Sequence, residues 1–294
     1  MGQYFSKSIK DEWNQQLFLY KRGFYNEKDC YDIKTIVQHI EQHPLFIKSM
    51  GLNNSTVNNK TRTQGVFYSE SHLSREKKIY QKIHNYFQYC SQLIFPVIIP
   101  PLYECIKEIF GEWRVLRATI MYTENGCPEQ EVHHDNEPGD NIFFISLPLH
   151  PTPIEQGPTI FYDDSIVAKY RRKPKTEEKN MNTYNNIGYF KNFKGQQKKD
   201  FALARKQYSQ NLGDFSIHRD ITFHSGGANT TKYTRKFLFL TCGLPNVGWN
   251  DFYQYNPSYG IQLVNSIQIV GDKPLKELEW AEIKDEDKNL FYNV

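Results

Sequence analysis

A short stretch at residues 129–136, EQEVHHDN, holds two adjacent histidines followed at once by an aspartate. Imidazole and carboxylate groups are common ligands of transition metals. If the stretch is a strand, its side chains alternate between two faces, so His133 and Asp135 share a face and His134 points away. The H-x-D pair is therefore the candidate metal-binding pair, although on its own the same stretch would also suit a surface turn.

A metal site needs a third ligand, and His224 is the histidine best placed to supply it. It ends the strand-like stretch GDFSIHRDITFH and is followed by a glycine-rich turn, SGGAN, and a second strand-like stretch, RKFLFLT. Two histidines and one carboxylate form the facial triad of non-haem Fe(II) enzymes, which leaves three coordination positions open. A zinc hydrolase with such ligands would also want a helical H-E-x-x-H motif or a nearby general base, and we find neither in the sequence.

Arg235 lies eleven residues after His224, at the start of the next expected strand. A chelating 2-oxo acid on the metal would have a far carboxylate that needs a cation. Arginine offers a carboxylate two charge-assisted hydrogen bonds. Because a turn between antiparallel strands would bring this side chain back toward the metal, Arg235 is the candidate anchor.

The remaining sequence supplies the elements that must position these residues. Apolar spacing predicts helices over residues 31–49, 73–95 and 100–113, with a polar loop at 53–65. After Trp113 short β-branched and aromatic runs predict strands. They cover residues 114–126, 141–151, 157–162, 213–224 and 235–243. Helices followed by clustered strands predict an α+β fold with a mainly β core.

We therefore expect one domain with three parts. Residues 1–112 form an N-terminal helical flank, residues 113–243 form the β core, and residues 244–294 form a C-terminal extension. The core is interrupted at residues 165–212 by a basic insertion with twelve lysines and arginines against three carboxylates. Such a length without strong periodicity predicts either a functional loop or a disordered one.

Three motifs together resemble the 2-oxoglutarate/Fe(II) oxygenase superfamily. They are Q-x-x-H-x-D at Gln130–Asp135, GPTIFY at 157–162, and GD…H-x-G-x-x-N…R in GDFSIHRDITFHSGGANTTKYTR. The eleven-residue spacing from His224 to Arg235 is most similar to the phytanoyl-CoA dioxygenase branch. The resemblance covers about residues 113–243. It departs at DDS (163–165), where the family commonly has a P-G-S-H turn, and at Gly226, where it often has serine.

The resemblance implies a double-stranded β-helix, or jelly roll, with flanking N-terminal helices. It implies that His133, Asp135 and His224 bind Fe(II) and that Arg235 binds the C5 carboxylate of the cosubstrate 2-oxoglutarate. It also implies that Tyr122 and Phe144 lie on strands that line the cosubstrate pocket. The implied activity uses O₂, converts 2-oxoglutarate to succinate and CO₂, and hydroxylates a small-molecule, lipid or acyl substrate. Asp135 argues against a halogenating variant, which must lack that carboxylate.

Two other readings stay open. A prolyl-type protein hydroxylase would usually carry its basic anchor nine or ten residues after the distal histidine, where this chain has Tyr233 and Thr234. A non-catalytic metal-binding relative would be expected to lose the triad and the arginine. The substrate itself is not identified by the sequence.

The composition of the chain and one N-terminal motif limit the cellular location and the partners that we expect. The net charge of +3 is too small to indicate a nucleic-acid partner. Five cysteines without a C-x-x-C pair predict free thiols in a reducing compartment. No apolar run is long enough to span a bilayer. Gly2 and Ser6 fit the myristoylation pattern M-G-x-x-x-[ST]. We therefore expect a cytoplasmic protein, with peripheral membrane contact through Gly2 and the basic insertion as one alternative.

Overall fold

The computed structural model describes residues 13–14, 16–43, 46, 54–57, 60–69, 81–135, 141–171 and 193–244. Its larger sheet has seven strands, all paired antiparallel. In spatial order these are β1 (Phe18–Lys21), β8 (Phe215–Arg219), β5 (Ile142–Pro148), β10 (Arg235–Gly243), β4 (Arg114–Thr123), β3 (Lys60–Ser69) and β2 (Asn54–Val57).

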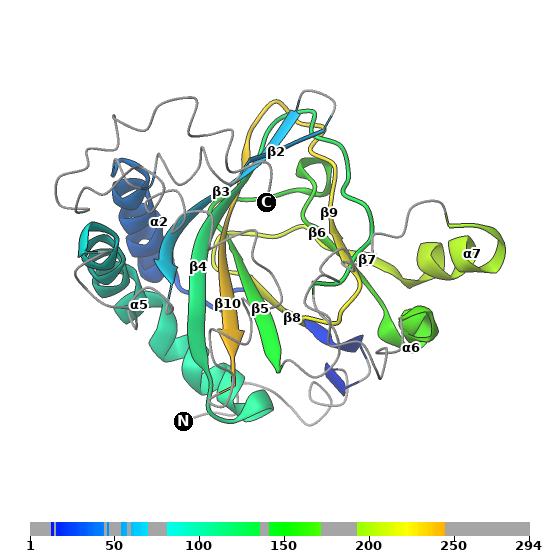
Figure 1. Ribbon diagram of the computed structural model, residues 1–294, viewed down its shortest axis with the longest axis horizontal. Coiled ribbons are helices and arrows are strands. Elements are labelled where there is room, and N and C mark those ends of the chain that lie inside the picture. Colours follow the sequence, from blue (N-terminus) through cyan, green and yellow to red (C-terminus); the bar gives the residue numbers. More distant parts are fainter. Residues whose placement is uncertain are drawn as a thin grey trace, which may run out of the picture.

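A smaller sheet faces the concave side of the larger one. It contains β7 (Arg205–Gln207), β6 (Thr159–Tyr162) and β9 (His224–Gly226), and an isolated bridge from His133 to His224 extends it beyond β9. Figure 1 shows the two sheets splayed around a common interior, with the helices outside them. Two antiparallel sheets of this kind form a jelly roll, so the expected double-stranded β-helix is confirmed.

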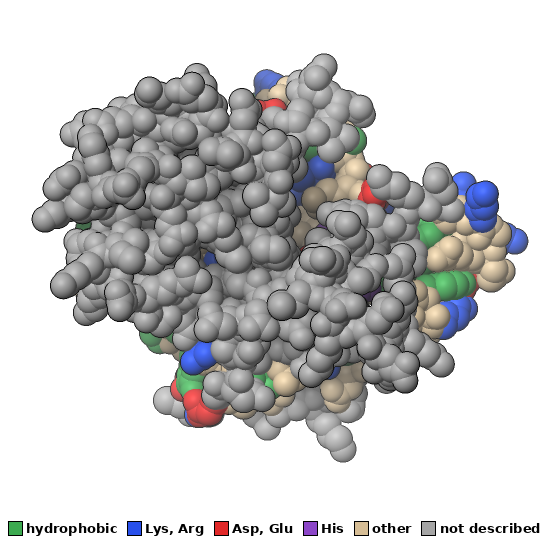
Figure 2. Space-filling model, in the orientation of Figure 1, with side chains coloured by type: hydrophobic (Ala, Val, Ile, Leu, Met, Phe, Trp, Pro, Cys, Tyr) green, Lys and Arg blue, Asp and Glu red, His purple; other side chains and the backbone are tan. Residues whose placement is uncertain are grey.

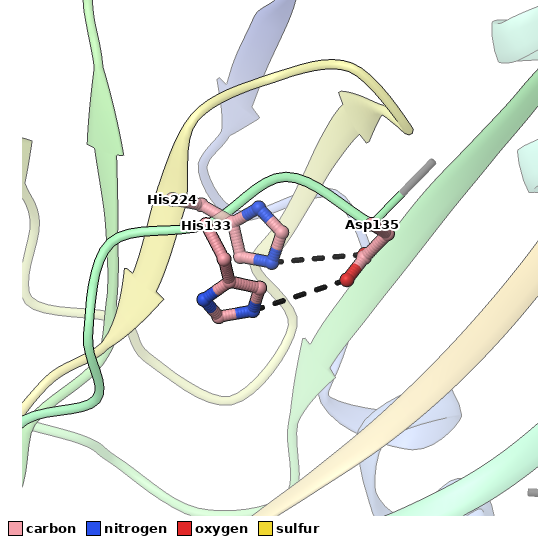
Figure 3. A group of neighbouring side chains, drawn as sticks. All are labelled: His133, Asp135 and His224. Atoms are coloured by element: carbon pink, nitrogen blue, oxygen red, sulfur yellow. Dashed lines mark ion pairs between the residues drawn. The ribbon is translucent and has the colours of Figure 1, made fainter. Parts of the chain in front are cut away.

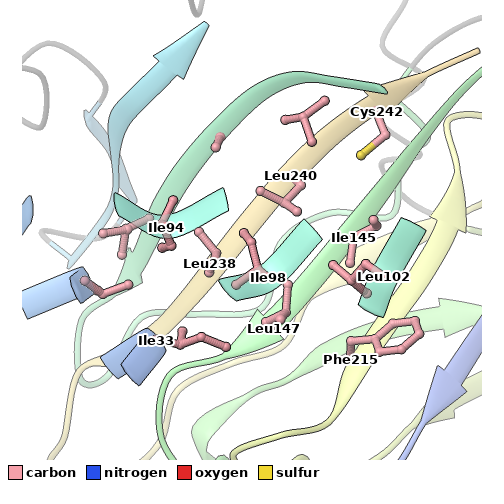
Figure 4. Packing of buried hydrophobic residues seen from close by; sticks show 14 of the residues in the cluster. Ile33, Ile94, Ile98, Leu102, Ile145, Leu147, Phe215, Leu238, Leu240 and Cys242 are labelled. Atoms are coloured by element: carbon pink, nitrogen blue, oxygen red, sulfur yellow. The ribbon is translucent and has the colours of Figure 1, made fainter. Parts of the chain in front are cut away.

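The hydrophobic core lies on the convex side of the larger sheet. There α2 (Glu27–Glu41) and α5 (Gln81–Phe110) cover the sheet with buried side chains. Ile94, Ile98 and Leu102 of α5 meet Leu238 and Leu240 of β10 (Figure 4). Helix residues four apart share a face, so α5 presents a continuous apolar stripe to the strands.

The two helices expected at 73–95 and 100–113 are in fact the single helix α5 where the structure describes them, with Pro96, Pro100 and Pro101 inside it. Proline removes a helical hydrogen bond and usually breaks a helix. Here Ile98, Leu102 and Ile106 are all fully buried. Burial of this stripe against the sheet therefore maintains the helix across the prolines. The helix expected at 31–49 begins earlier, because the Asn26 side chain caps the backbone N–H of Asp29.

The N-terminal flank is only partly helical. Residues 53–65, expected to be a polar loop, include β2 and most of the β2–β3 hairpin, and β1 forms the opposite edge of the sheet. Edge strands with few apolar residues carry a weak sequence signal, because pairing with the neighbouring strand stabilises them. In this case β3 pairs with β4, and Arg62 lies opposite Thr123. The flank and the core therefore form one sheet.

The basic insertion is ordered where the structure describes it. Residues 164–170 form α6 (Asp164–Val167) and the 3₁₀ turn Ala168–Tyr170, and α7 (Gly195–Ala204) leads into β7. Phe201 and Ala204 of α7 are buried against Phe223 and Tyr162, which explains the order. Lysine and arginine side chains gather at the α7 end of the molecule (Figure 2). Residues 172–192 of the insertion, Gly2 and residues 245–294 lie outside the described ranges.

Two further expectations concern strands and thiols. The strand expected at 213–224 is two strands, β8 and β9, separated by a turn at residues 220–223. All five cysteines are free, as expected, and all five are buried. Within the described ranges, none of the helices combines the length and apolar character needed to cross a bilayer.

Candidate metal centre

The backbone brings His133, Asp135 and His224 to one point between the two sheets. His133 N–H donates to the carbonyl of His224 at 2.9 Å, and His224 N–H donates to the carbonyl of His133 at 2.8 Å. Asp135 N–H donates to the carbonyl of Asp220, in the turn that links β8 to β9, at 2.9 Å. His133 and Asp135 are therefore held by backbone hydrogen bonds to the β8–β9 segment, which also carries His224.

The three side chains converge (Figure 3). His133 Nε2 lies 3.9 Å from Asp135 Oδ1, and His224 Nε2 lies 3.7 Å from Asp135 Oδ2. One ligand atom from each residue lies within 4.8 Å of the others. The expected triad is thus a cluster in space, with two imidazole nitrogens and a carboxylate facing a common point.

Each imidazole is oriented by its second nitrogen. His133 Nδ1 contacts the carbonyl of Glu131 at 2.8 Å, and His224 Nδ1 contacts the carbonyl of Thr222 at 2.9 Å. Because a carbonyl only accepts, both Nδ1 atoms donate, so in a neutral ring the Nε2 atom is the one that can bind a metal. Burial, assisted by His224, lowers the pKa of His133 to about 4. The two rings therefore have the orientation typical of metal-binding histidines.

His134 takes no part in this cluster. Its ring meets Phe223 edge-on, with centroids 5.4 Å apart, and the residue is buried. Strand alternation thus assigned the correct histidine of the adjacent pair to the cluster. The stretch is a two-residue bridge rather than a full strand, but it alternates in the same way.

The triad opens into a pocket between the two sheets. Arg235 lines the pocket, and its Nη2 donates to Thr123 Oγ1 at 2.8 Å. Its Nη1 is buried and has no hydrogen-bond partner. Burial, together with the nearby charge of Arg62, lowers the pKa of Arg235 to about 9. The cation is therefore short of an anionic partner, which a carboxylate ligand would supply.

Of the two residues expected on pocket-lining strands, Phe144 lines the pocket and Tyr122 does not. Tyr122 lies on β4 with its hydroxyl 2.5 Å from Glu41 Oε1 of α2. Side chains alternate along a strand, and Arg117, Thr119 and Met121 of β4 are the residues that face the pocket. The expectation for Tyr122 chose the right strand and the wrong face.

Two residues that line the pocket were not predicted from the sequence. His218 of β8 is fully buried, its ring lies 4.7 Å from that of His224, and burial holds its pKa well below the usual value. Arg117 of β4 is 6% exposed and lines the same pocket. The available signal was an arginine within the otherwise apolar run RVLRATIMY and a histidine within the strand GDFSIH. A charged or titratable residue at a core position of a strand indicates a site.

Solved structures of other proteins share the fold of this chain. No protein-family model matches the sequence, and no curated protein sequence is significantly similar to it. The non-haem α-ketoglutarate-dependent epimerase SnoN from nogalamycin biosynthesis, in complex with Fe³⁺, α-ketoglutarate and nogalamycin RO, superposes with a TM-score of 0.55. The alignment covers 81% of this chain and 83% of SnoN at 13% identity.

Two further solved structures are similar. The carbocyclase SnoK from the same biosynthesis aligns with a TM-score of 0.54 and 14% identity, over 82% of this chain and 84% of its own. EctD from S. alaskensis, with 2-oxoglutarate and 5-hydroxyectoine, aligns with a TM-score of 0.54 and 11% identity, over 83% and 78%. At these identities the likeness establishes the fold of this chain, a jelly roll found among α-ketoglutarate-dependent enzymes.

Proposed function

We propose that this protein is an Fe(II)- and 2-oxoglutarate-dependent oxygenase. In this proposal His133, Asp135 and His224 hold the iron, and Arg235 binds the far carboxylate of 2-oxoglutarate. The observation that carries the proposal is that the triad and the buried arginine line one pocket between the two sheets. The solved structures of similar fold, which include complexes with iron and 2-oxoglutarate, support it.

The residues fit these two groups chemically. Two imidazoles and one carboxylate suit Fe(II) and leave positions for a chelating cosubstrate and O₂. When bound, iron and 2-oxoglutarate would supply oxidative decarboxylation to succinate and CO₂, coupled to hydroxylation of a substrate. The chain's own part is to fix ligand geometry, to shape the pocket and to orient the reactants.

The arginine end of the pocket is organised for a carboxylate. Thr123 Oγ1 accepts from Arg235 Nη2 and so fixes the guanidinium. Arg62 lies opposite Thr123 in β3 and donates to backbone carbonyls, including that of Gly226 at 3.4 Å. The Gly226 N–H is in turn held by Gln130 Oε1 at 2.9 Å. These contacts connect the cosubstrate end to the strand that carries His224.

Hydroxylation of a small-molecule, lipid or acyl substrate is the reaction we propose. The eleven-residue spacing between His224 and Arg235 supports likeness to the phytanoyl-CoA dioxygenase branch. Asp135 occupies the position that a halogenating enzyme leaves empty, which supports oxygen transfer. The similar structures include an epimerase and a carbocyclase, so the assay must detect turnover of the cosubstrate rather than one product type.

The experiment is a turnover screen. Purified protein with Fe(II), ascorbate and 2-oxoglutarate is assayed for succinate across lipids, acyl-CoAs, small carboxylates and proline-rich peptides. The proposal expects Fe(II)-dependent succinate that rises with a non-peptide substrate and disappears in Asp135→Ala. Stimulation by peptides alone would favour a prolyl-type hydroxylase. Absence of succinate under every condition, with iron retained, would favour a non-catalytic metal-binding relative.

A further inference from the structure

His218 of β8 lines the pocket beside the triad. Its ring centroid lies 4.7 Å from that of His224 and 5.2 Å from those of Phe144 and Phe161. The residue is only 1% exposed. Aromatic contacts therefore hold this imidazole in place next to one of the histidines that we assign to the metal.

Neither ring nitrogen of His218 has a hydrogen-bond partner in the described part of the chain. His133 and His224, by contrast, each direct Nδ1 to a backbone carbonyl. An imidazole carries at least one N–H whether it is neutral or protonated, so His218 has a donor to spare in either state. A buried donor without an acceptor is destabilising, and a bound ligand is one explanation for keeping it.

His218 and Arg235 lie toward opposite ends of the pocket, with His224 between them. Arg62 Nη2, at the cosubstrate end, donates to the carbonyl of Gly226, the last residue of β9, at 3.4 Å. His224 is the first residue of the same strand, and the His218 ring is next to it. A ligand that Arg235 holds by one end and that reaches the triad therefore presents its other end toward His218.

2-Oxoglutarate has such a second end, its 2-oxo acid group. A carboxylate oxygen is a strong acceptor for an imidazole N–H, and the apolar surface of Phe144 and Phe161 around the ring strengthens such a bond. We propose that His218 donates a hydrogen bond to the carboxylate of the 2-oxo acid group and so orients the cosubstrate. This inference rests on the proposed function and adds a cosubstrate-binding residue from β8.

The test compares two ligands and measures binding without turnover. 2-Oxoglutarate has both carboxylates, whereas 2-oxopentanoate keeps the 2-oxo acid group and lacks the far carboxylate. Each is titrated by calorimetry into Mn(II)-loaded protein. His218→Phe keeps a ring among the aromatic side chains and removes both nitrogens. It should weaken both ligands roughly tenfold or more, because each loses one charge-assisted hydrogen bond.

Three further variants make the result specific. Arg235→Gln should weaken 2-oxoglutarate and leave 2-oxopentanoate nearly unchanged, because only the former has a far carboxylate. His218→Asn keeps an amide N–H and should retain part of the affinity for both ligands. His134→Phe removes the nitrogens of another buried histidine, one outside the pocket lining, and should leave both affinities unchanged.

Three results would overturn the inference. One is wild-type affinity for both ligands in folded, Mn(II)-loaded His218→Phe. Another is a His218→Phe variant that binds 2-oxoglutarate weakly and 2-oxopentanoate normally, which would assign His218 to the far carboxylate. The third is loss of Mn(II) binding in both His218 variants, which would make the residue a support of the metal site. Failure of the wild type to bind Mn(II) and 2-oxoglutarate would instead contradict the proposed function, and the inference with it.

Discussion

His133 and His224 are joined by an antiparallel backbone bridge, and the same two residues direct their Nε2 atoms toward Asp135. Their reciprocal N–H to carbonyl distances are 2.9 and 2.8 Å, and their Nε2 atoms lie 3.9 and 3.7 Å from the two Asp135 oxygens. Each histidine is thus positioned by the backbone of the other. Displacing either segment would displace both imidazoles.

The triad makes the first prediction. His133→Ala, Asp135→Ala and His224→Ala should each abolish Fe(II) binding and 2-oxoglutarate turnover. Loss of an outer partner of a metal ligand alone costs roughly 10–100-fold in affinity, so loss of a ligand should cost more. The measurement is the iron content of each variant after anaerobic loading and gel filtration.

His134→Ala is the matched control for the triad. It removes a buried ring that contacts Phe223, so it should lower the free energy of unfolding by roughly 0.5–3 kcal/mol. It should keep its iron and substantial activity. Full iron occupancy in His133→Ala together with loss in His134→Ala would mean that the wrong histidine has been assigned.

The second prediction concerns Arg235. Arg235→Ala should raise the KM for 2-oxoglutarate by roughly 30-fold or more, because a buried charge pair broken from one side costs about 2–5 kcal/mol. Iron binding should stay nearly intact. Lys236→Ala is the control, since its Nζ contacts Glu41 on the other face of β10 at 2.8 Å. An unchanged KM in Arg235→Ala would remove this residue from the site.

The sequence was informative where residue periodicity and burial agree. Alternation at 133–135 assigned His133 and Asp135 to one side, and Arg235 begins β10 at the expected position. On β4 the same alternation turns Met121 toward the pocket and Tyr122 toward α2, contrary to the expectation for Tyr122. Which face of a strand buried on both sides is functional depends on the partner strands, and a single sequence does not contain that information.

Elements stabilised mainly by distant contacts were harder to predict. The hairpin β2–β3 has few apolar residues and depends on pairing with β4. Helix α5 continues through Pro96 and Pro100 because Ile98 and Leu102 are buried against the larger sheet. His218 is close to His224 only because β5 lies between β8 and β10. Tertiary packing, which local propensity does not report, decides all three.

A third prediction addresses the loop that links His224 to Arg235. Gly157 has φ +72°, and a Cβ there would lie 2.4 Å from the carbonyl oxygens of Gly227 and Ala228. Gly111 has a similar φ of +75° with nothing within 4 Å of an added Cβ. Gly111→Ala should therefore lower the free energy of unfolding only by the strain of a left-handed backbone at a non-glycine residue, about 1–2 kcal/mol. Gly157→Ala should lower the free energy of unfolding by at least about 1 kcal/mol more, because the backbone at residues 227–228 must also move.

Denaturant unfolding of the two glycine variants measures this difference directly. Gly157→Ala should also weaken 2-oxoglutarate binding, because the displaced loop leads into Arg235. Equal destabilisation by the two substitutions would show that the close approach of Gly157 to residues 227–228 contributes nothing.

The fourth prediction concerns membranes, for which Gly2 and residues 172–192 lie outside the described part of the chain. On α7 and β7, Lys198, Lys199 and Arg205 are exposed, and Leu203 is 70% exposed. A myristoyl chain alone binds only marginally, and each basic residue near an anionic surface adds about 1 kcal/mol. Acylated protein should therefore co-sediment with anionic liposomes at low salt. Replacing Lys198, Lys199 and Arg205 by glutamine should weaken this co-sedimentation.

A matched control variant replaces Lys28 and Lys34 of α2, which are exposed at the other end of the molecule. It should co-sediment like the wild type. If wild-type and substituted proteins all remain in the supernatant, the membrane prediction is wrong.

The most direct measurement of the central claim is an anaerobic titration of the protein with Fe(II) and 2-oxoglutarate, followed by visible absorption. Chelation of iron by the 2-oxo acid produces a charge-transfer band that neither component gives alone. The wild type should give this band at one iron and one 2-oxoglutarate per chain. His224→Ala should lose it, and Arg235→Ala should require much more 2-oxoglutarate to reach it. A wild-type protein that binds iron without the band, or an undiminished band in His224→Ala, would contradict the account.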